Sequence, residues 1–369
     1  MFAPLAGVRV LELAPFLPGP FAGAQLLALG AEVVKLEPPG GDPGRHLPDG
    51  LFAMNNRGKK SLCLDLKAPG ATQLVQRLVA GFDVVLEGFR PGVAKRLSVD
   101  YDSLRQARPD IIYCSLSGFG QDGTRAQLPG HDLTYLAAGG ALARAGHWQG
   151  PPRRLGVPVA DTAGGLFAAL AVVSALLRRQ TGGAGAYLDA SLTDAALSLA
   201  ACRGLAAPES RQHLHPANDL FHCRDGGVIA VGLLEDHFFE AFVAALGAAG
   251  TALRHPDFAN MASRQRNGDA LHSLLDRLMA TRDVAEWEAL AAAHKLPLAK
   301  VLNVSEALAV QDPGVPAPAF PVRVDHQRLS APLQSAPVLG ADSAQILSGL
   351  GLDQSTLMAL HQAGVVPST

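Results

Sequence analysis

The first 200 residues contain short runs of Val, Leu and Ile that alternate with longer amphipathic stretches. The apolar runs predict buried strands, and stretches with apolar residues at every third or fourth position predict helices. We place strands at 8–13, 32–37, 83–87 and 111–116, and helices at 21–29 and 71–79. Strands that alternate with helices form βαβ units in a mostly parallel sheet. The pattern therefore predicts a doubly wound α/β fold, in which ligands bind at the carboxyl ends of the strands.

The pattern changes around residues 204–220, where prolines and histidines indicate an irregular connector. Two short strands follow, joined by a turn at Asp225-Gly226-Gly227, and helical stretches come after them. A Pro-rich segment at 313–321 is typical of a linker. We predict a large Rossmann-like domain at 1–205 that residues from about 325 to 369 complete, a small α+β domain at 220–312, and linkers at 206–219 and 313–324.

Composition narrows the class of protein. A chain of 369 residues exceeds the size at which single cores divide, which is about 250–300 residues. The net charge of −2 argues against nucleic acid or an anionic membrane as a partner. The four cysteines have no C-x-x-C spacing, so we expect reduced, mostly buried thiols and a cytoplasmic protein. Residues 1–7 lack a basic stretch followed by an apolar core, so we expect no secretory signal. The apolar run at 164–177 is shorter than the roughly 20 residues that span a bilayer, and it predicts a buried helix.

Two nucleotide-binding motifs are missing from the chain. The turn after the first predicted strand, at residues 14–23, lacks G-x-G-x-x-G, and no Walker sequence is present. Glu37, at the end of the second strand, imitates the acid that binds ribose in dinucleotide folds, but a single acid is weak support. We therefore do not expect NAD or ATP chemistry.

His131 and Asp161 are the most informative polar residues. Each stands where a Gly- or Pro-marked segment meets an apolar, Ala-rich stretch, so each is expected at the N-terminus of a helix. Free N–H groups and the helix dipole favour negative charge at that position. Together the two side chains could supply an acid and a base, but taken alone each also fits an ordinary cap or a packed residue.

Basic residues cluster beside glycine and proline in two places. Arg57 and Lys60 surround Gly58, and Arg90 precedes Pro91-Gly92 with Arg96 close behind. Such loops bind phosphate when glycine lets backbone N–H groups approach it, although a solvated basic surface has the same composition. The histidines and the cysteine of the connector, His213, His215, His222 and Cys223, lack the spacing of a zinc site, and we predict no metal.

Short Gly- and Pro-rich motifs recur in order along the first 200 residues. They are Leu13-Ala14-Pro15 with Pro18-Gly19-Pro20, Asn56-Arg57-Gly58-Lys59-Lys60, Glu87-Gly88-Phe89-Arg90-Pro91-Gly92, Ser117-Gly118-Phe119-Gly120-Gln121, Val157-Pro158-Val159-Ala160-Asp161, and Thr181-Gly182-Gly183-Ala184-Gly185-Ala186-Tyr187-Leu188-Asp189. Together they resemble the family III CoA-transferases, the CaiB/BaiF superfamily. The resemblance implies acyl-CoA substrates, with coenzyme A as part of the thioester and no tightly bound cofactor. It also implies an interlocked homodimer, with each active site between the large domain of one chain and the small domain of the other.

Two chemistries in this superfamily use the position of Asp161. In the transferases the aspartate attacks an acyl-CoA and carries the acyl group, whereas in the α-methylacyl-CoA racemase branch it is one of two acid/base groups at the α-carbon. Gly130-His131-Asp132 with Tyr135 resembles the racemase pattern, and Glu235 matches the small-domain glutamate that orients the racemase histidine. The resemblance therefore indicates a racemase of 2-methyl-branched acyl-CoA, acting through an enolate. A CoA-transferase with Asp161 as nucleophile, or a CoA-ester binding protein without catalysis, are the other readings.

The resemblance also guides where coenzyme A should bind. Relatives carry an arginine after the second strand, where this chain has Pro38-Pro39. We therefore expect the CoA contacts elsewhere, among Lys35, Arg57, Lys60, Arg90, Arg96 and Asp132. Backbone N–H groups at the start of the helix that carries Asp161 are expected to hold the enolate oxygen.

Overall fold

The protein is described from a computed structural model that covers residues 2–48, 50–143, 146, 148, 154–202, 204–205, 214–311, 313–315, 317–329 and 334–367. The chain forms two compact units. The first contains residues 1–141, 155–200 and 314–369, and the second contains 142–154 and 201–313. The division differs from the predicted one in that a short stretch before Leu155 belongs to the second unit.

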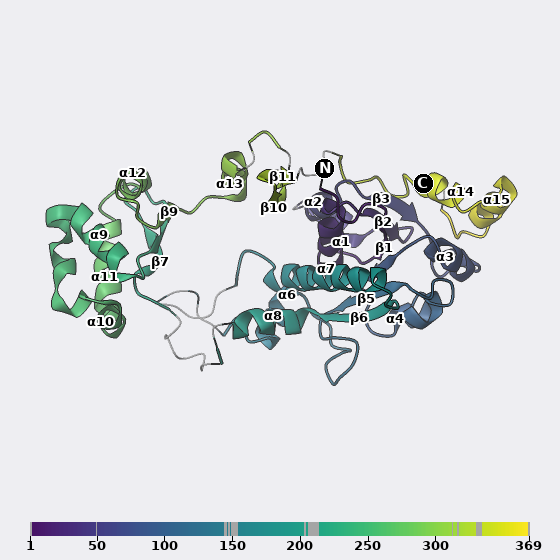
Figure 1. Ribbon diagram of the computed structural model, residues 1–369, viewed down its shortest axis with the longest axis horizontal. Helices are drawn as coiled ribbons and strands as arrows, with labels where there is room; N and C mark the ends of the chain where they lie inside the picture. Colours follow the sequence, from purple (N-terminus) through teal and green to yellow (C-terminus); the bar gives the residue numbers. More distant parts are fainter. Residues whose placement is uncertain are drawn as a thin grey trace. The chain divides into compact units, whose positions relative to one another are not determined.

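The first unit is built on a six-stranded parallel sheet with the order β3-β2-β1-β4-β5-β6 (Figure 1). Its strands are β1 (Arg9–Leu13), β2 (Glu32–Glu37), β3 (Lys60–Cys63), β4 (Val84–Glu87), β5 (Ile112–Ser117) and β6 (Ala186–Ser191). The strand order reverses between β1 and β4, and this switch point is where doubly wound sheets bind ligands. The sheet confirms the predicted fold class.

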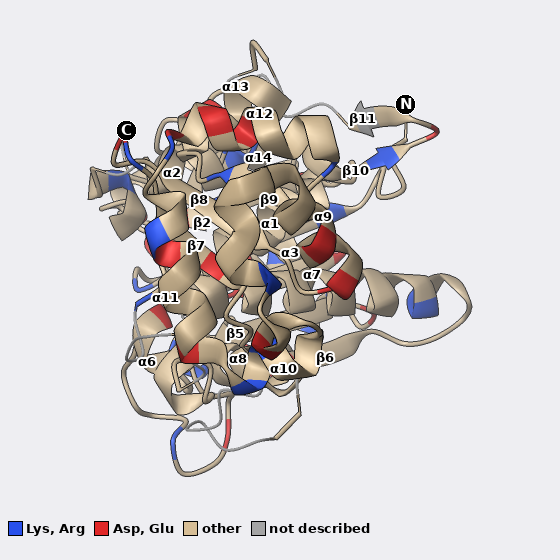
Figure 2. Ribbon diagram, turned by 90° about the vertical axis from the view of Figure 1, so that its left-hand side faces the viewer, with Lys and Arg blue, Asp and Glu red and all other residues tan. Residues whose placement is uncertain are grey.

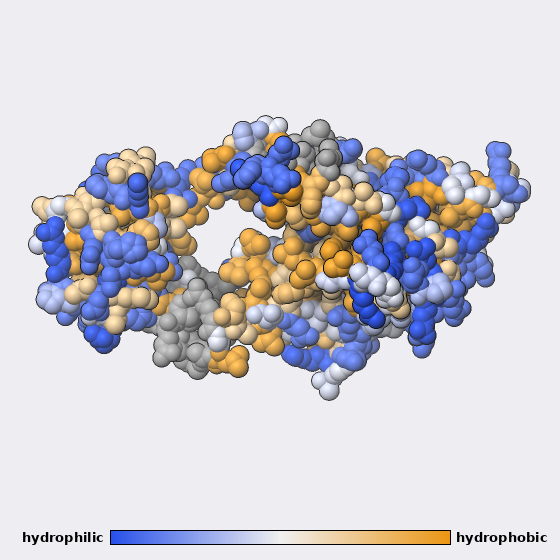
Figure 3. Space-filling view, in the orientation of Figure 1, coloured by the Kyte–Doolittle hydropathy of each residue, from blue (hydrophilic) through white to orange (hydrophobic). Residues whose placement is uncertain are grey.

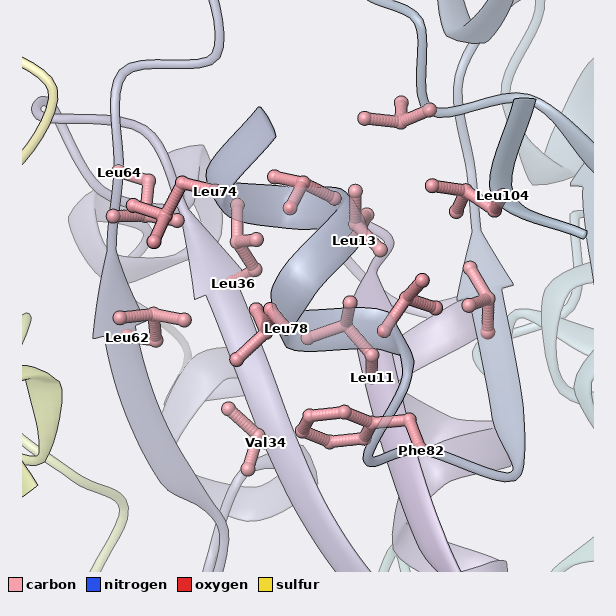
Figure 4. Packing of buried hydrophobic residues seen from close by; sticks show 14 of the residues in the cluster. Leu11, Leu13, Val34, Leu36, Leu62, Leu64, Leu74, Leu78, Phe82 and Leu104 are labelled. Atoms are coloured by element: carbon pink, nitrogen blue, oxygen red, sulfur yellow. The ribbon is translucent and has the colours of Figure 1, made fainter. Parts of the chain in front are cut away.

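Hydrophobic layers cover both faces of this sheet. Alternate strand residues point to opposite faces, so Leu11 faces one layer and Val10 the other. Helix α3 (Ala71–Val79) contributes Leu74 and Leu78 to the layer that Figure 4 shows. Helices α1 (Pro18–Ala28) and α7 (Val159–Gln180) pack against each other on the opposite face. Both layers fix the strand ends that carry the candidate site.

Helix α7 is longer than the apolar run at 164–177 predicted. It has 22 residues, and by length and composition it could cross a membrane. One face, with Ala163, Gly164, Ala168 and Val172, is buried against the sheet and α1. Four large side chains of α7 remain exposed, namely Leu166, Phe167, Leu170 and Leu177. The predicted burial therefore holds for one face, and the other presents an apolar surface, which Figure 3 shows over α7 and α8 (Leu192–Ala201).

Short helices connect the remaining strands of the first unit. They are η1 (Pro43–His46), α2 (Leu51–Asn55), α4 (Val93–Arg96), α5 (Tyr101–Leu104) and α6 (Asp132–Ala138). The C-terminal part returns to this unit with α14 (Ser343–Ser348) and α15 (Gln354–Gln362). Both helices pack against the same hydrophobic layer as α3. Phe320–Val324 pairs with Gln327–Leu329 as the hairpin β10–β11, so the end of the segment predicted as a linker forms a strand.

The second unit has a three-stranded antiparallel sheet with the order β7-β8-β9. Strands β7 (Asn218–His222) and β8 (Val228–Gly232) form the predicted hairpin around the Asp225-Gly226-Gly227 turn, and β9 is Leu298–Lys300. The helical elements are α9 (Asp236–Leu246), η3 (Gly247–Arg254), η4 (Pro256–Phe258), α10 (Met261–Arg266), α11 (Gly268–Met279), α12 (Val284–His294) and α13 (Val304–Gln311). Phe221, Phe242 and Trp287 are central to its core. This is the predicted α+β arrangement.

Charged residues of both signs are interspersed along the elements in Figure 2. This mixed pattern agrees with the small net charge of −2. Cys63, Cys114 and Cys223 are buried free thiols, as predicted, while Cys202 is exposed.

Candidate active site

A cavity of about 910 Å³ opens at the carboxyl ends of β1 to β4 in the first unit. Its walls come from the segments that follow these strands, including Ala14 and Pro15 after β1, Pro38 after β2 and Phe89 after β4. Pockets for small molecules and cofactors have volumes of about 300–1,000 Å³, so the cavity can hold a nucleotide-sized ligand. It lies at the switch point of the sheet, where the strand pattern predicts a ligand.

Two exposed basic residues line this cavity. Lys67 follows β3, and Arg96 is the last residue of α4. Arg96 is among the predicted CoA contacts, whereas Lys67 was not singled out as a binding residue. The sequence feature that could have identified Lys67 as a binding residue is its position in Leu64-Asp65-Leu66-Lys67, directly after a buried strand. The cavity thus combines apolar walls with cations that a phosphate can reach.

Lys35 lines the cavity, but its charge is already neutralised. Its side chain is buried and lies 3.1 Å from Glu12 and 2.8 Å from Asp42. Burial alone would lower the pKa of this ammonium, yet the two carboxylates outweigh burial and the pKa is raised. Lys35 also donates to the carbonyl of Ala14 at 2.8 Å. Lys35 therefore has a structural role: its ion pairs and its hydrogen bond to Ala14 hold the loop after β1.

Glu37 is likewise bound by other side chains of the protein. The guanidinium of Arg45 donates to both of its carboxylate oxygens at 2.7 Å, and the hydroxyl of Ser61 donates at 2.8 Å. Burial alone would raise the pKa of this carboxyl, but Arg45 and Ser61 hold the pKa below its usual value. The acid that imitates a ribose-binding residue therefore makes internal contacts.

The other predicted CoA contacts occupy different places. Lys60 begins β3 at the amino-terminal edge of the sheet and pairs with Glu32 at 2.9 Å. Arg57 lies half-buried after α2. Arg90 is exposed in the loop after β4, near Tyr135; burial and Asp161 raise the pKa of Tyr135, and the charge of Arg90 partly opposes them. Of these three, Arg90 lies at the carboxyl edge of the sheet.

His131 and Asp161 both stand at helix N-termini, as the sequence predicts. His131 is the N-cap of α6 and is exposed, with its N–H donating to the hydroxyl of Thr134 at 3.0 Å. Asp161 lies in the first turn of α7 and is partly buried. Burial, followed by the charge of Asp132, raises the pKa of Asp161 to about 7. Such a group exchanges a proton readily near neutral pH.

Asp132 connects these two helices. Its Oδ1 atom accepts the N–H of Ala160 at 2.7 Å and that of Asp161 at 3.3 Å. The residue that follows His131 thus caps the helix that carries Asp161. This contact is not visible in the sequence, because it joins residues that are 29 positions apart.

Two glycines make room for the ring of Tyr135 beside this pair. A Cβ atom on Gly118 would lie 2.3 Å from the ring, and one on Gly130 would lie 2.5 Å from it. The ring also meets Phe119 edge to face. The glycines in the Ser-Gly-Phe-Gly and Gly-His-Asp motifs therefore have a packing reason, since side chains at these positions would displace Tyr135.

Glu235 belongs to the second unit, where it is the exposed N-cap of α9. The fully buried Arg264 fixes the residues on either side of it. Its guanidinium donates to the carbonyl of Leu234 at 2.9 Å and to the carboxylate of Asp236 at 2.7 Å. His215 and Cys223 are buried in the same unit, while His213 lies outside the described residues. Among the described residues, no three His, Cys, Asp or Glu side chains are grouped as metal ligands.

Comparison with known protein families gives one match over nearly the whole chain. The profile described as CoA-transferase family III matches residues 5–347. Among solved structures, a CAIB/BAIF family protein from Brucella suis superimposes with a TM-score of 0.81 at 28% identity. That superposition covers 95% of this chain and 100% of the other.

Characterised proteins of two kinds are similar to the chain. The acetyl-CoA:oxalate CoA-transferase of Acetobacter aceti is 34% identical over 364 residues, which are 89% of this chain and 92% of that protein. The alpha-methylacyl-CoA racemase of Homo sapiens is 33% identical over 294 residues, which are 77% of this chain and 74% of that protein. The two identities are nearly equal, so the choice between the chemistries depends on the site itself.

Proposed function

The chain belongs to CoA-transferase family III, and on that premise we propose that it is an isomerase of the α-methylacyl-CoA racemase kind. Its substrates would be acyl-CoA thioesters with a methyl branch at the α-carbon. The observation that carries this proposal is the pair of proton-exchanging groups at adjoining helix N-termini, His131 and Asp161. A second acid/base group beside the aspartate is what racemisation needs and acyl transfer does not.

The reaction consists of two proton transfers at one carbon. The α-proton of a thioester is weakly acidic, so a base must remove it from one face while the thioester oxygen takes up the negative charge. An acid on the opposite face then returns a proton to the α-carbon and yields the other epimer. Asp161 and His131 exchange these roles with the handedness of the substrate, and each transfer contributes about 10²–10⁴-fold.

The pKa of Asp161 suits both roles. At about 7 it leaves comparable amounts of carboxylate and carboxylic acid at neutral pH. A general acid/base is most effective when its pKa lies close to the working pH. A nucleophilic carboxylate, in contrast, must be ionised, and an ordinary aspartate would meet that need better. The raised pKa therefore favours proton transfer over acyl transfer.

The enolate oxygen needs a different partner from the one the sequence suggests. The N–H groups of Ala160 and Asp161 at the start of α7 are bound to Asp132, so these two donors are not free to hold the oxygen. Helix α6 begins directly after His131, and the first N–H groups of a helix have no partner within it. We assign the oxygen to the N–H groups of Asp132 and Leu133.

The nucleotide part of coenzyme A would occupy the cavity at the carboxyl ends of β1 to β4. Its size and its position at the switch point support this assignment. Lys67, Arg96 and Arg90 are exposed cations at that edge of the sheet, and they would contact the phosphates. Lys35 would act indirectly by holding the loop after β1.

A second copy of the chain would cover the apolar face of α7 and α8. This face exposes Leu166, Phe167, Leu170, Leu177, Leu197 and Leu199. Exposed apolar patches of this kind mark interaction sites. In the resulting homodimer, Glu235 from the small domain of the second copy would lie beside His131 of the first. It would orient the imidazole of His131 and stabilise its charged form.

A CoA-transferase with Asp161 as covalent nucleophile is the second candidate. The similarity to the acetyl-CoA:oxalate CoA-transferase, which covers 89% of this chain, favours it. The carboxylate would attack the thioester carbonyl and expel CoA as its thiolate. The thiolate would then attack the aspartyl carbonyl of the resulting mixed anhydride and release the donor as a carboxylate. An acceptor carboxylate would displace CoA from Asp161 through a second mixed anhydride, and CoA would attack the acceptor carbonyl to give the new thioester and free Asp161. Nothing in that cycle uses His131.

One incubation tests the proposal. The purified full-length protein is mixed with the S epimer of 2-methyldecanoyl-CoA in D₂O, and the product is examined by NMR and chiral chromatography. The proposal predicts α-deuterium together with formation of the R epimer. Added oxalate, succinate or acetate should yield no new acyl-CoA. Transfer to such an acceptor without α-deuteration would replace the proposal by the second candidate.

A further inference from the structure

Asp132 makes a contact that the proposed reaction does not use. Its carboxylate accepts the N–H of Ala160 at 2.7 Å and the N–H of Asp161 at 3.3 Å. These donors belong to the first turn of α7, whereas Asp132 is the first residue of α6. One carboxylate therefore joins the N-termini of two helices, one carrying His131 as its N-cap and the other carrying Asp161.

We propose that Asp132 is a positioning residue that fixes His131 and Asp161 relative to each other and keeps a negative charge beside Asp161, so that a proton is retained on the pair. This inference rests on the proposed function, in which His131 and Asp161 exchange a proton with the substrate. It replaces the expectation that Asp132 contacts coenzyme A. A carboxylate that accepts two backbone N–H groups is already engaged, and its charge would repel a phosphate.

The geometric part follows from how helix ends behave. The first N–H groups of a helix have no intrahelical acceptor, and an anion there is stabilised by both the N–H groups and the dipole. The carboxylate satisfies two of these donors on α7 while its own backbone begins α6. Because His131 is adjacent to Asp132 in the chain, the bond that anchors Asp132 also limits how far His131 can move from Asp161.

The electrostatic part concerns the groups that face Asp161. Asp132 acts on Asp161 from the first residue of α6. Tyr135, one turn further along the same helix, has its pKa raised by burial and by Asp161, while Arg90 acts on Tyr135 in the opposite direction. Asp132 is the group among them that raises the pKa of Asp161, in addition to burial. Tyr135 is uncharged near neutral pH, because burial and Asp161 raise its pKa. Removing the charge of Asp132 should therefore lower the pKa of Asp161.

Two substitutions separate position from charge. Asp132→Asn keeps an oxygen that can accept both N–H groups but removes the charge, and Asp132→Ala removes both. For Asp132→Asn we expect KM to change little and the acidic limb of the kcat/KM profile to move to lower pH. For Asp132→Ala we expect the same movement together with a loss in kcat of roughly 100-fold, since small misplacements of reacting groups cost about that much. Epimerisation of 2-methyldecanoyl-CoA is the assay.

Asp353→Asn is the matched control. Asp353 caps α15 by accepting the N–H of Thr356 at 2.7 Å, in the same unit but on another helix. This variant should leave both the pH profile and kcat unchanged. Urea unfolding of all three variants shows whether an altered rate reflects a misfolded protein.

A second readout does not depend on turnover. In protein labelled with ¹³C at the aspartate carboxyl carbons, the signal that Asp161→Asn abolishes reports the titration of Asp161. Its midpoint should fall in Asp132→Asn and stay in place in Asp353→Asn. If the wild type fails to epimerise any branched thioester, the proposed function fails while this titration still tests Asp132. An unchanged midpoint in Asp132→Asn, or full kcat in a folded Asp132→Ala protein, would overturn the inference.

Discussion

The ammonium of Lys59 lies 2.7 Å from the Oε2 atom of Glu12, and both side chains are fully buried beneath the loop after β1. Glu12 also binds Lys35 through its other oxygen at 3.1 Å. The two lysines in turn donate to the carbonyls of Ala14 and Pro20. The loop after β1 and the start of α1 are thus held in place by buried charges that neutralise one another.

Glu12→Gln should destabilise the protein strongly. The change leaves two buried ammonium groups without their shared carboxylate, and breaking a buried ion pair costs about 3–5 kcal/mol. Urea unfolding measures the free energy of unfolding. Glu32→Gln is the control, because Glu32 pairs with Arg9 and Lys60 near the surface, and such pairs contribute about 1 kcal/mol at most. Equal losses in the two variants would contradict the buried network.

The pH profile of the reaction distinguishes a racemase from a transferase. Racemisation needs one proton on the pair, with Asp161 ionised and His131 protonated for one epimer and the reverse for the other. These two forms hold the same number of protons, so both directions should show the same bell-shaped kcat/KM profile. A nucleophilic Asp161 only needs to be ionised, so its profile would rise through a pKa of about 7 and then stay level.

Arg96→Met should weaken binding of acyl-CoA and leave the chemical step intact. If Arg96 contacts a phosphate, the loss of a charge-assisted hydrogen bond should raise KM by roughly 10- to 150-fold, since such bonds contribute about 1.5–3 kcal/mol. Lys95→Met, on an exposed residue that does not line the cavity, should change KM little. An N-acetylcysteamine thioester lacks the nucleotide, so it should not distinguish Arg96→Met from the wild type. A higher KM of Arg96→Met for this thioester would contradict the assignment of Arg96 to the phosphates.

Gly118→Ala should destabilise the site by crowding Tyr135. The new Cβ atom would lie 2.3 Å from the ring, and overpacking of this kind costs about 1–3 kcal/mol. Gly40→Ala is the matched control, because a Cβ atom at Gly40 has no neighbour within 4 Å. The melting temperature and kcat are measured for both. A Gly118→Ala protein as stable and active as Gly40→Ala would show that the ring does not need this space.

The sequence predicted the parts of the fold that depend on local pattern. The strands at 32–37 and 83–87 and the helix at 71–79 match β2, β4 and α3 to within one residue. Strand β3 was missed, because Lys60 and Ser61 interrupt the apolar pattern with side chains that neighbouring strands neutralise or bind. Pairings of this kind depend on the folded sheet.

The site shows the same division. His131 and Asp161 could be placed at helix N-termini because glycine and proline mark where those helices begin. The role of Lys35 could not be predicted, because Glu12 and Asp42 are brought to it from two other segments. The capping of α7 by Asp132 was hidden for the same reason. Sequence patterns indicate which residues bear chemistry, and tertiary contacts decide which of them are free to use it.

The central claim is that His131 and Asp161 form a two-base pair on opposite faces of the α-carbon. The measurement that tests it most directly is α-deuterium exchange from each epimer of 2-methyldecanoyl-CoA separately, in His131→Ala and in Asp161→Asn. We predict that both variants lose epimerisation, and that each retains slow exchange with one epimer, a different one in each variant. Undiminished epimerisation in His131→Ala, or exchange lost only in Asp161→Asn, would contradict the claim.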